Sequence, residues 1–340
     1  MSKVRILFMG TPDFARTVLE SLVADEHFEI VGVVTQPDRP AGRKMKLTPS
    51  PVKELALEKG LTVFSPETVN TAEFCAEIEK LGAESAVVVA FGQLLGDAFL
   101  ALFPKGAVNV HGSLLPKWRG AAPIQRSLMA GDSETGVALQ MVVKKLDAGA
   151  VLGVRKVRLS EDDTATNIYP RLAKLGCELL STEYMDYLRG NLTPISQDET
   201  LVTIAPKIKK SEAAIDWTKP AAEIVNLVRG LALGPVPHAR RATEAGGQGA
   251  SFKVHRAKLV ANLGTSASAP GARAPGTVFE VAEDSFVVVA GDGQGVRILE
   301  TQPESRAKMS VRDYLKGYPI NLGEVLQNGQ AAPASSGDTK

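Results

Sequence analysis

The sequence predicts an α/β protein: a doubly wound, parallel-sheet domain of the Rossmann-like kind, followed by a smaller OB-like β-barrel domain. In the first half, short apolar runs alternate with longer stretches of helical spacing, which is typical of parallel strands joined by crossover helices. In the second half, short strand candidates are separated by turns rich in Gly and Pro, as in small barrels. The length of 340 residues agrees with two domains, because it exceeds what one hydrophobic core usually organises.

The first domain is expected to open as strand, turn and helix. Residues 4–9 form a compact apolar run, Gly10 follows it, and the apolar side chains of residues 13–24 recur at helical spacing. Further strands are expected at residues 29–35, 86–91, 107–110, 137–143 and 151–157, and further helices at residues 51–59, 71–81 and 165–189. This alternation predicts a doubly wound sheet that one long helix closes.

The chain changes character after residue 189. Residues 190–210 are polar and contain Pro194 and Pro206, which indicates a linker. A helix is then expected at residues 221–231, with strands at 251–258, 276–281, 285–290 and 295–299. The expected domains are residues 1–189 and 209–326, with a linker at 190–208, a mobile loop at 264–275 and a disordered tail at 327–340.

Composition excludes several classes of protein. Apolar residues make up 44% and charged residues 23%, and no apolar run approaches the roughly 20 residues that a membrane-spanning helix needs. The amino terminus shows no small-residue cleavage site after its apolar run, so export is not expected. Cys75 and Cys177 are too few for a disulfide framework and belong to no zinc motif. We expect a cytoplasmic protein, monomeric, with both cysteines as buried thiols and no metal.

The net charge of +1 is divided unevenly along the chain. Residues 1–204 hold 22 Lys and Arg against 25 Asp and Glu, or −3, whereas residues 205–325 hold 16 against 12, or +4. A basic second half suits a polyanionic partner, although a shift of this size is also common in proteins without one.

The first turn does not fit a dinucleotide site. The Rossmann motif needs three glycines, for the turn, for the approach of pyrophosphate and for helix packing, and this turn has Gly10 alone. Pro12 also lacks the backbone N–H that a phosphate would bind. We therefore expect a plain strand-to-helix turn, with Thr11 or Asp13 capping the helix.

Asn109 and His111 are the strongest candidates for chemistry. Both lie at the end of the strand expected at residues 107–110, and alternation places their side chains on one side of it. Polar groups at the carboxyl end of a parallel strand face the cleft where ligands bind, and Gly112 lets the chain turn away. The alternative is a buried, hydrogen-bonded histidine beside a turn-forming asparagine.

Asp147 favours the chemical interpretation. It lies in a loop between two expected strands and just before a glycine, so its carboxylate can reach His111 and hold the imidazole in one orientation. This trio suits formyl transfer between nitrogens. Asn109 and His111 would donate to the oxygen that becomes negative when an amine attacks the formyl carbon. Asp147, directly or through water, would move the proton to the departing nitrogen, without metal or covalent intermediate.

At these residues the chain resembles the folate-dependent formyltransferases. The trio falls in that family's pattern, and so do residues 10–15 (GTPDFA), 36–43 (QPDRPAGR) and 110–124 (VHGSLLPKWRGAAPI). The resemblance continues through residues 197–200, 215–217 and 308–310 and covers nearly all of the chain except 326–340. It is closest to those members that act on methionine carried by initiator tRNA. Members that formylate glycinamide ribonucleotide resemble the first domain only and leave residues 205–325 unexplained.

The resemblance implies 10-formyltetrahydrofolate as the formyl donor and initiator methionyl-tRNA as the acceptor. It places the donor near residues 113–116, with residues 88–92 and the loop before Asp147 lining the pteridine pocket. Apolar walls with a few backbone hydrogen bonds suit a flat heteroaromatic ring. The implied donor-binding residues are Ser113, Leu114, Leu115, Pro116, Val89, Phe91 and Gly92. Alone, residues 113–116 would also fit an ordinary turn.

Residues 35–53 form a long, basic and turn-rich segment beside the proposed cleft. Taken alone, such a segment is usually solvated surface; the resemblance points to Arg43 as the residue that reaches the acceptor helix of the tRNA. Expected tRNA contacts are Arg39, Arg43, Lys44 and Lys46 in this segment and Lys207, Lys209 and Lys210 in the linker. Further phosphate contacts are expected from Arg240, Arg241, Lys253, Arg256 and Lys258.

One segment departs from the family pattern. Where relatives usually carry an aromatic stretch resembling Asn-Pro-Trp-Pro, residues 231–237 read LALGPVP, which puts a stacking contact of the second domain in doubt. Two rival functions stay open at this point: formyl transfer to a small amine such as an amino sugar nucleotide, and binding of RNA or folate without catalysis.

Overall fold

The computed structural model describes residues 3–41, 46–242, 248–264 and 274–329. The chain divides into two compact units. The first consists of Met1–Ile124, Glu134–Arg158 and Asn167–Lys207, and the second of Gln125–Ser133, Leu159–Thr166 and Ile208–Lys340. Two short segments of the first half of the sequence therefore belong to the second unit. The predicted limits of independently folding domains, at residues 189 and 209, stay a prediction.

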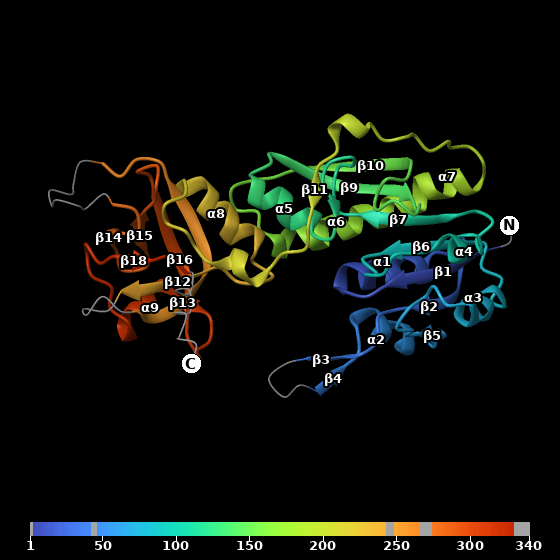
Figure 1. Cartoon of the computed structure of the whole chain (residues 1–340), viewed down its shortest axis with the longest axis horizontal. Coiled ribbons are helices and arrows are strands. Elements are labelled where there is room, and N and C mark those ends of the chain that lie inside the picture. Colours follow the sequence, from blue (N-terminus) through green and yellow to red (C-terminus); the bar gives the residue numbers. More distant parts are fainter. Residues whose placement is uncertain (1–2, 42–45, 243–247, 265–273, 330–340) are drawn as a thin grey trace, which may run out of the picture. The chain divides into compact units, whose positions relative to one another are not determined.

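A seven-stranded sheet forms the first unit, in the order β10-β9-β7-β6-β1-β2-β5 (Figure 1). Its strands are β1 (Val4–Gly10), β2 (Phe28–Val34), β5 (Val63–Phe64), β6 (Ser85–Val89), β7 (Ala107–His111), β9 (Glu134–Met141) and β10 (Val151–Arg158). Five neighbouring strands of this sheet run parallel: β7, β6, β1, β2 and β5. Strands β9 and β10 are antiparallel additions at one edge. The predicted doubly wound α/β class is confirmed, with all but the last two strands parallel.

The inner strand β1, between β6 and β2, is buried on both faces, which explains its uninterrupted apolar run. Ile6, Leu7, Phe8 and Met9 have no exposed surface. Leu7 and Met9 join the core that contains Phe74 and Phe99. The helices of this unit are α1 (Asp13–Ala24), α2 (Pro51–Glu58), α3 (Ala72–Glu79), α4 (Asp97–Leu100), α6 (Ala165–Leu179) and α7 (Met185–Leu188).

The predicted long helix of residues 165–189 is nearly continuous. Between α6 and α7 lies one π-helical turn (Leu180–Tyr184), in which Leu180 and Tyr184 are buried. The predicted cap of α1 is wrong. The helix begins after Pro12 without a side-chain cap among the described residues. The hydroxyl of Thr11 instead donates to the carbonyl of Phe91 and accepts from the N–H of Gln36, so it ties together the loops that follow three strands.

The basic segment of residues 35–53 contains a small hairpin, β3 (Arg39–Ala41) and β4 (Lys46–Thr48), which projects away from α2 (Figure 1). The sequence predicted a turn-rich segment here but no strands. At its base Lys53 donates to both carboxylate oxygens of Asp38 at 2.9 Å. This ion pair joins the residue just before the hairpin to α2, the helix that follows it.

The second unit contains a curled antiparallel sheet in the order β14-β15-β16-β13-β12-β18, with β17 paired to β16. The elements are α8 (Ala221–Gly230), β12 (His238–Ala242), β13 (Gln248–Val260), β14 (Val278–Val281), β15 (Phe286–Val289), β16 (Gly295–Pro303), β17 (Met309–Ser310), α9 (Val311–Gly317) and β18 (Leu326–Gln327). The two ends of the sheet meet, since Thr277 and Val325 form a bridge and the N–H of Val278 donates to the carbonyl of Glu324. This closure confirms the predicted OB-like barrel class.

The barrel packs around aromatic side chains. Phe252, Phe286 and Tyr314 are at most 2% exposed, and the ring of Phe252 contacts the other two; Trp217 and α8 contribute to the same core. Strand β12 and helix α9 were not predicted. The helix α5 (Pro123–Ala130) begins in the first unit, and from Gln125 its residues belong to the second.

Two further expectations have a structural outcome. Both cysteines are free, but Cys75 and Cys177 are only half-buried, so the prediction of buried thiols is wrong. Among the described residues, no helix is both long and apolar enough to span a bilayer. Most of the loop expected to be mobile (265–273) and most of the tail expected to be disordered (330–340) lie outside the described residues.

Candidate active site

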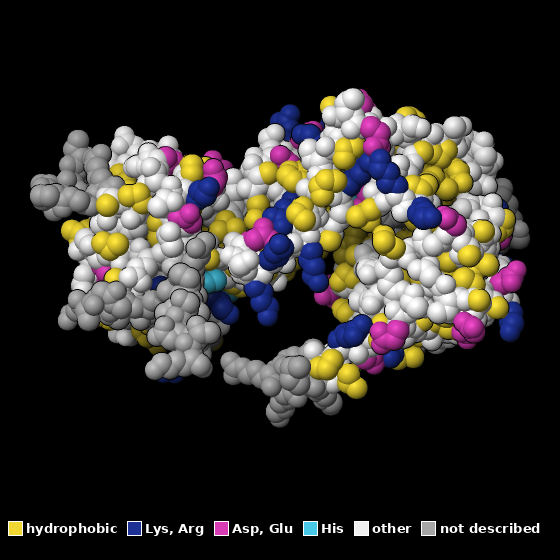
Figure 2. All heavy atoms as spheres, in the orientation of Figure 1, with side chains coloured by type: hydrophobic (Ala, Val, Ile, Leu, Met, Phe, Trp, Pro, Cys, Tyr) yellow, Lys and Arg dark blue, Asp and Glu magenta, His cyan; other side chains and the backbone are white. Residues whose placement is uncertain are grey.

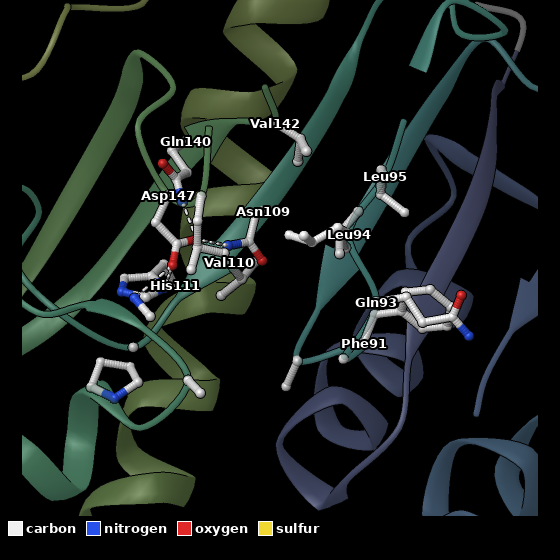
Figure 3. Close-up of a pocket in the computed structure, with 18 of the residues that line it drawn as sticks. Phe91, Gln93, Leu94, Leu95, Asn109, Val110, His111, Gln140, Val142 and Asp147 are labelled. Atoms are coloured by element: carbon white, nitrogen blue, oxygen red, sulfur yellow. Dashed lines mark hydrogen bonds and ion pairs between the residues drawn. The ribbon is translucent and has the colours of Figure 1, made fainter. Parts of the chain in front are cut away.

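A cavity of about 540 Å³ opens in the first unit where β6 and β7 end. This volume lies in the range of small-molecule sites. Figure 3 shows Asn109, His111, Gln140 and Asp147 gathered on one side, with Phe91 and Leu94 across from them. One wall is therefore polar, and the other is mainly apolar, with Gln93 beside Phe91 and Leu94.

Asn109 and His111 come from β7, as predicted. His111 is the last residue of the strand, and alternation turns both side chains toward the cavity. Asn109 lies opposite Gln140 of the antiparallel strand β9, so their side chains are neighbours on the same face. The cavity thus takes its polar wall from two adjacent strands.

Asp147 reaches this wall because its loop folds back over β9. The residue has a φ of +49°, a left-handed conformation that non-glycine residues seldom adopt. Two positions later, an added Cβ at Gly149 would lie 1.7 Å from the carbonyl oxygen of Met141. Only glycine permits the loop to pack this closely on the end of β9. The sequence showed a carboxylate in a loop, and the structure shows how the loop returns.

Three N–H groups hold the carboxylate of Asp147. Its Oδ1 accepts from Nδ2 of Asn109 at 3.3 Å and from Nε2 of Gln140 at 2.9 Å. Its Oδ2 accepts from the backbone N–H of Gly120 at 2.8 Å and lies 3.7 Å from Nδ1 of His111. The structure therefore brings the three predicted side chains together in one cavity.

His111 is oriented from both sides of its ring. Its side chain is 6% exposed, and Nε2 lies 2.9 Å from the backbone oxygen of Trp118. Because a carbonyl only accepts, Nε2 carries the hydrogen of that bond. Nδ1 is then the nitrogen that faces Asp147. The ring is fixed with one nitrogen on the backbone and the other toward the carboxylate.

Sequence reasoning missed Gln140. It is 1% exposed and contacts Asp147 directly, yet it stands in an apolar strand without a motif. A buried glutamine in a core strand is a weak signal by itself. Its meaning depends on the register between β7 and β9, which places it opposite Asn109.

The predicted donor-binding residues fall into two groups. Phe91 and Gly92 line the cavity. Val89 is fully buried in β6, and residues 113–116 lie outside the cavity lining. Ser113, also fully buried, donates from its hydroxyl to the carbonyl of Lys117 at 2.6 Å, which closes the turn after β7.

The predicted tRNA contacts lie in different surroundings. Arg39 is exposed and lies 3.5 Å from Glu67. Arg43 and Lys44 lie outside the described residues, and Lys46 belongs to β4. Lys207, Lys209 and Lys210 are exposed.

The barrel cations are also unequal. Arg241 forms a two-point ion pair with Glu324, at 2.6 and 2.9 Å, and Lys258 pairs with Asp162 at 3.0 Å. Arg256 lies 3.9 Å from the same aspartate, Lys253 is exposed and Arg240 is half-buried. Figure 2 shows Lys and Arg side chains mingled with Asp and Glu on the face it presents.

Among the described residues, no group of three or more His, Cys, Asp and Glu side chains is placed to hold a metal ion.

Comparison with known proteins identifies related sequences over most of the chain. Residues 2–183 match the family described as formyl transferase, and residues 207–319 match its C-terminal domain. The chain is 52% identical to the methionyl-tRNA formyltransferase of Bdellovibrio bacteriovorus, over 96% of this chain and 99% of that protein. It is 42% identical to the methionyl-tRNA formyltransferase of Acidithiobacillus ferrooxidans, over 95% and 99%.

Solved structures share the fold at lower identity. The N-formyltransferase from Helicobacter canadensis, in complex with folinic acid and dTDP-3-aminofucose, has a TM-score of 0.62 and 17% identity. The match covers 88% of this chain and 99% of that one.

Proposed function

The chain belongs to the formyl transferase family, and on that premise we propose that it transfers the formyl group of 10-formyltetrahydrofolate to the α-amino group of methionine on initiator tRNA. The main support for this proposal is that the side chains of Asn109, His111 and Asp147 lie together in one cavity. Such a transfer needs fixed donors for a developing oxyanion and a group that moves one proton. Similarity to two curated methionyl-tRNA formyltransferases over nearly the whole chain supports this choice of acceptor.

The cavity suits the donor. Phe91, Leu94, Leu95 and Val142 offer apolar surface to the flat pteridine ring, and Asn109, His111, Gln140 and Asp147 gather across from Phe91 and Leu94. That asymmetry orients the formyl group toward Asn109 and His111 while the ring lies against the apolar wall. Phe91 and Gly92 are the donor contacts favoured by their position in the lining.

Asn109 and His111 act on the formyl oxygen. The amide nitrogen of Asn109 carries two hydrogens, one of which goes to Asp147, and the second can reach the oxygen as it becomes negative. A protonated His111 donates from both ring nitrogens, so it can keep Trp118 through Nε2 and serve the site through Nδ1. The tetrahedral adduct is thereby stabilised.

Asp147 moves the proton. Attack by the methionine nitrogen forms a C–N bond and leaves that nitrogen with a surplus proton. The carboxylate takes the proton, directly or through water, and returns it to the folate nitrogen as the old C–N bond breaks. The products are N-formylated methionyl-tRNA and tetrahydrofolate, and no other reactant is required.

The acceptor would be held by basic side chains outside the cavity. The proposed phosphate contacts are Arg39, Arg43, Lys44 and Lys46 of the basic segment 35–53 and the exposed Lys207, Lys209 and Lys210. In the barrel, Lys253 is exposed, whereas Arg241 is engaged by Glu324 and is a weaker candidate than the sequence suggested. We expect the protein to work in the cytoplasm as a monomer.

The test offers the purified protein 10-formyltetrahydrofolate with either methionyl-tRNA or an amino sugar nucleotide. We expect formylation of the tRNA-bound methionine. The second substrate is included because the related Helicobacter canadensis structure holds dTDP-3-aminofucose. Formylation of the sugar with charged tRNA left untouched would replace the proposed acceptor, and turnover of neither would favour a binding protein.

A further inference from the structure

The chain returns to the active-site loops after it leaves the catalytic sheet. Ile195 forms a bridge with Val151, and β11 (Ile204–Ala205) pairs in parallel with β8 (Arg119–Gly120). We name residues 195–205 the strap. The partner strand β8 supplies the Gly120 N–H that binds the carboxylate of Asp147. The strap therefore lies against one of the groups that fix the proposed proton carrier.

Gln197 of the strap contacts the Asp147 loop itself. Its Nε2 lies 2.9 Å from the backbone oxygen of Asp147 and 2.7 Å from that of Gly149. A third acceptor, Oε1 of Gln140, lies at 3.3 Å. One amide nitrogen thus donates to both ends of the short segment that carries the carboxylate.

Arg119 determines which way this amide points. Its Nε and Nη2 donate to Oε1 of Gln197 at 3.0 and 2.9 Å, and its side chain is 3% exposed. A guanidinium only donates, so it must face the amide oxygen, which turns the amide nitrogen toward the loop. Glu199 accepts from the same Nη2 of Arg119 at 2.8 Å and pairs with Lys145 at 2.7 Å, which further fixes the guanidinium.

The loop needs such support. Asp147 adopts a left-handed conformation, and strained residues persist only where the surroundings over-determine them. Without the two Gln197 contacts, the loop would keep its side-chain bonds but would lose a tie on its backbone. A small displacement of the carboxylate matters, because a shift of about 1 Å can cost roughly 100-fold in rate.

We propose that Gln197, oriented by Arg119, is a positioning residue that holds the Asp147 carboxylate at the distance proton transfer requires. The proposal rests on the proposed function. This role requires a side chain that accepts hydrogen bonds from Arg119 and donates hydrogen bonds to the Asp147 loop. Among side chains of similar shape, only glutamine does both. Glutamate could accept from Arg119 but would present a carboxylate to two carbonyl oxygens.

That difference supplies the experiment. Gln197→Glu keeps an acceptor for Arg119, and the new ion pair should preserve the strap, whereas the donor to Asp147 and Gly149 is lost. We expect kcat to fall by about 10- to 100-fold while both KM values change by less than about threefold. Gln197→Ala should lower kcat similarly and also lower the melting temperature.

A matched control is Arg155→Ala. It removes another two-point pair of the same unit, that of Arg155 with Glu183 at 2.6 and 3.0 Å, from a strand that lies outside the cavity lining. This variant should lower the melting temperature and leave kcat unchanged. A Gln197→Glu variant with kcat within about threefold of wild type, or a control with an equal loss of kcat, would overturn the proposal.

The two hypotheses fail in different ways. A wild-type protein that does not formylate methionyl-tRNA contradicts the proposed function. A wild-type protein that does so, together with a fully active Gln197→Glu variant, contradicts only the positioning role.

Discussion

At the residue scale, the site combines groups that alternation brings together with groups that only tertiary structure can place. Asn109 and His111 follow from the register of one strand, so their common face was predictable. Asp147 was predictable as a carboxylate in a loop, but its left-handed backbone was not. Gln140 escaped notice because its role depends on which residue of β7 it faces.

Asp147→Asn tests the proton carrier. The asparagine keeps the shape but presents an NH₂ group where the carboxylate accepts from Asn109, Gln140 and Gly120, so at least one of these bonds must be lost. We expect single-turnover formylation to slow by about 10²- to 10⁴-fold with donor affinity nearly unchanged. Asp186→Asn, an exposed change on α7, is the control. Retention of the wild-type rate would exclude Asp147 as the proton carrier.

Gly149→Ala tests the loop's packing. The new Cβ would lie 1.7 Å from the backbone oxygen of Met141, so we expect the loop that carries Asp147 to shift. We expect the free energy of unfolding to fall by about 1–3 kcal/mol, with a loss of kcat. Denaturant titration measures the free energy of unfolding, and an activity assay measures kcat. At Gly317 an added Cβ meets nothing within 4 Å, so Gly317→Ala should lower neither. Equal stability of the two variants would argue against the tight contact.

At the element scale, periodic segments were predictable and short pairings were not. The strands from β1 to β10 with clear apolar runs appear within a few residues of their expected limits. Strands β3, β4, β8 and β11 have two or three residues each, too few to show a period, and they exist because a partner segment arrives beside them. The strap on β8 could not be seen in a sequence whose residues 190–210 read only as a polar linker.

Arg43→Ala tests the hairpin. The proposed role of Arg43 is contact with the acceptor helix, so its loss should weaken methionyl-tRNA binding and spare the donor. We expect KM for tRNA to rise by about 5- to 100-fold, on the order of 1–3 kcal/mol, with donor KM unchanged. Lys174→Ala, an exposed cation of α6, is the matched control. An equal loss of affinity for tRNA and for the donor would show that Arg43 does not act on tRNA binding alone.

Glu84→Gln tests the end of the sheet away from the site, where β1, β6 and β7 begin. A hydrogen bond from Lys105, and then one from the Arg5 N–H, lower the pKa of Glu84, which joins the starts of β1, β6 and β7. A lowered pKa in the folded state means that the stabilisation is complete above the unfolded pKa and is lost as pH falls through the folded one. Wild type should therefore lose more stability than Glu84→Gln below a pH of about 4.5.

Thermal unfolding at several pH values measures this difference. Because the pair lies away from the cavity lining, kcat at neutral pH should be the same in both proteins. If wild type and Glu84→Gln lost stability equally as pH falls, the role of Glu84 would be contradicted. Glu20→Gln, an exposed change on α1, is the control.

At the scale of the whole molecule, the proposed function requires the cavity to bind a small donor and the exposed cations to bind a large polyanion. These two kinds of binding respond differently to salt. Contacts between cations and phosphates release counterions, and each one lost lowers the slope of log affinity against log salt by about one. The proposed contacts between the folate ring and apolar walls release no counterions, so donor binding should depend only weakly on salt.

Combined replacement of Lys207, Lys209 and Lys210 by alanine tests this division. These three exposed side chains follow β11 directly, so their loss should leave the strap and the cavity intact. We expect tRNA affinity to fall and its salt slope to decrease by about three, while donor affinity keeps its shallow salt dependence. Filter binding across a salt series measures the first and fluorescence titration the second. An unchanged slope would mean that these lysines bind no phosphate, and the hairpin and the barrel would then have to hold the tRNA.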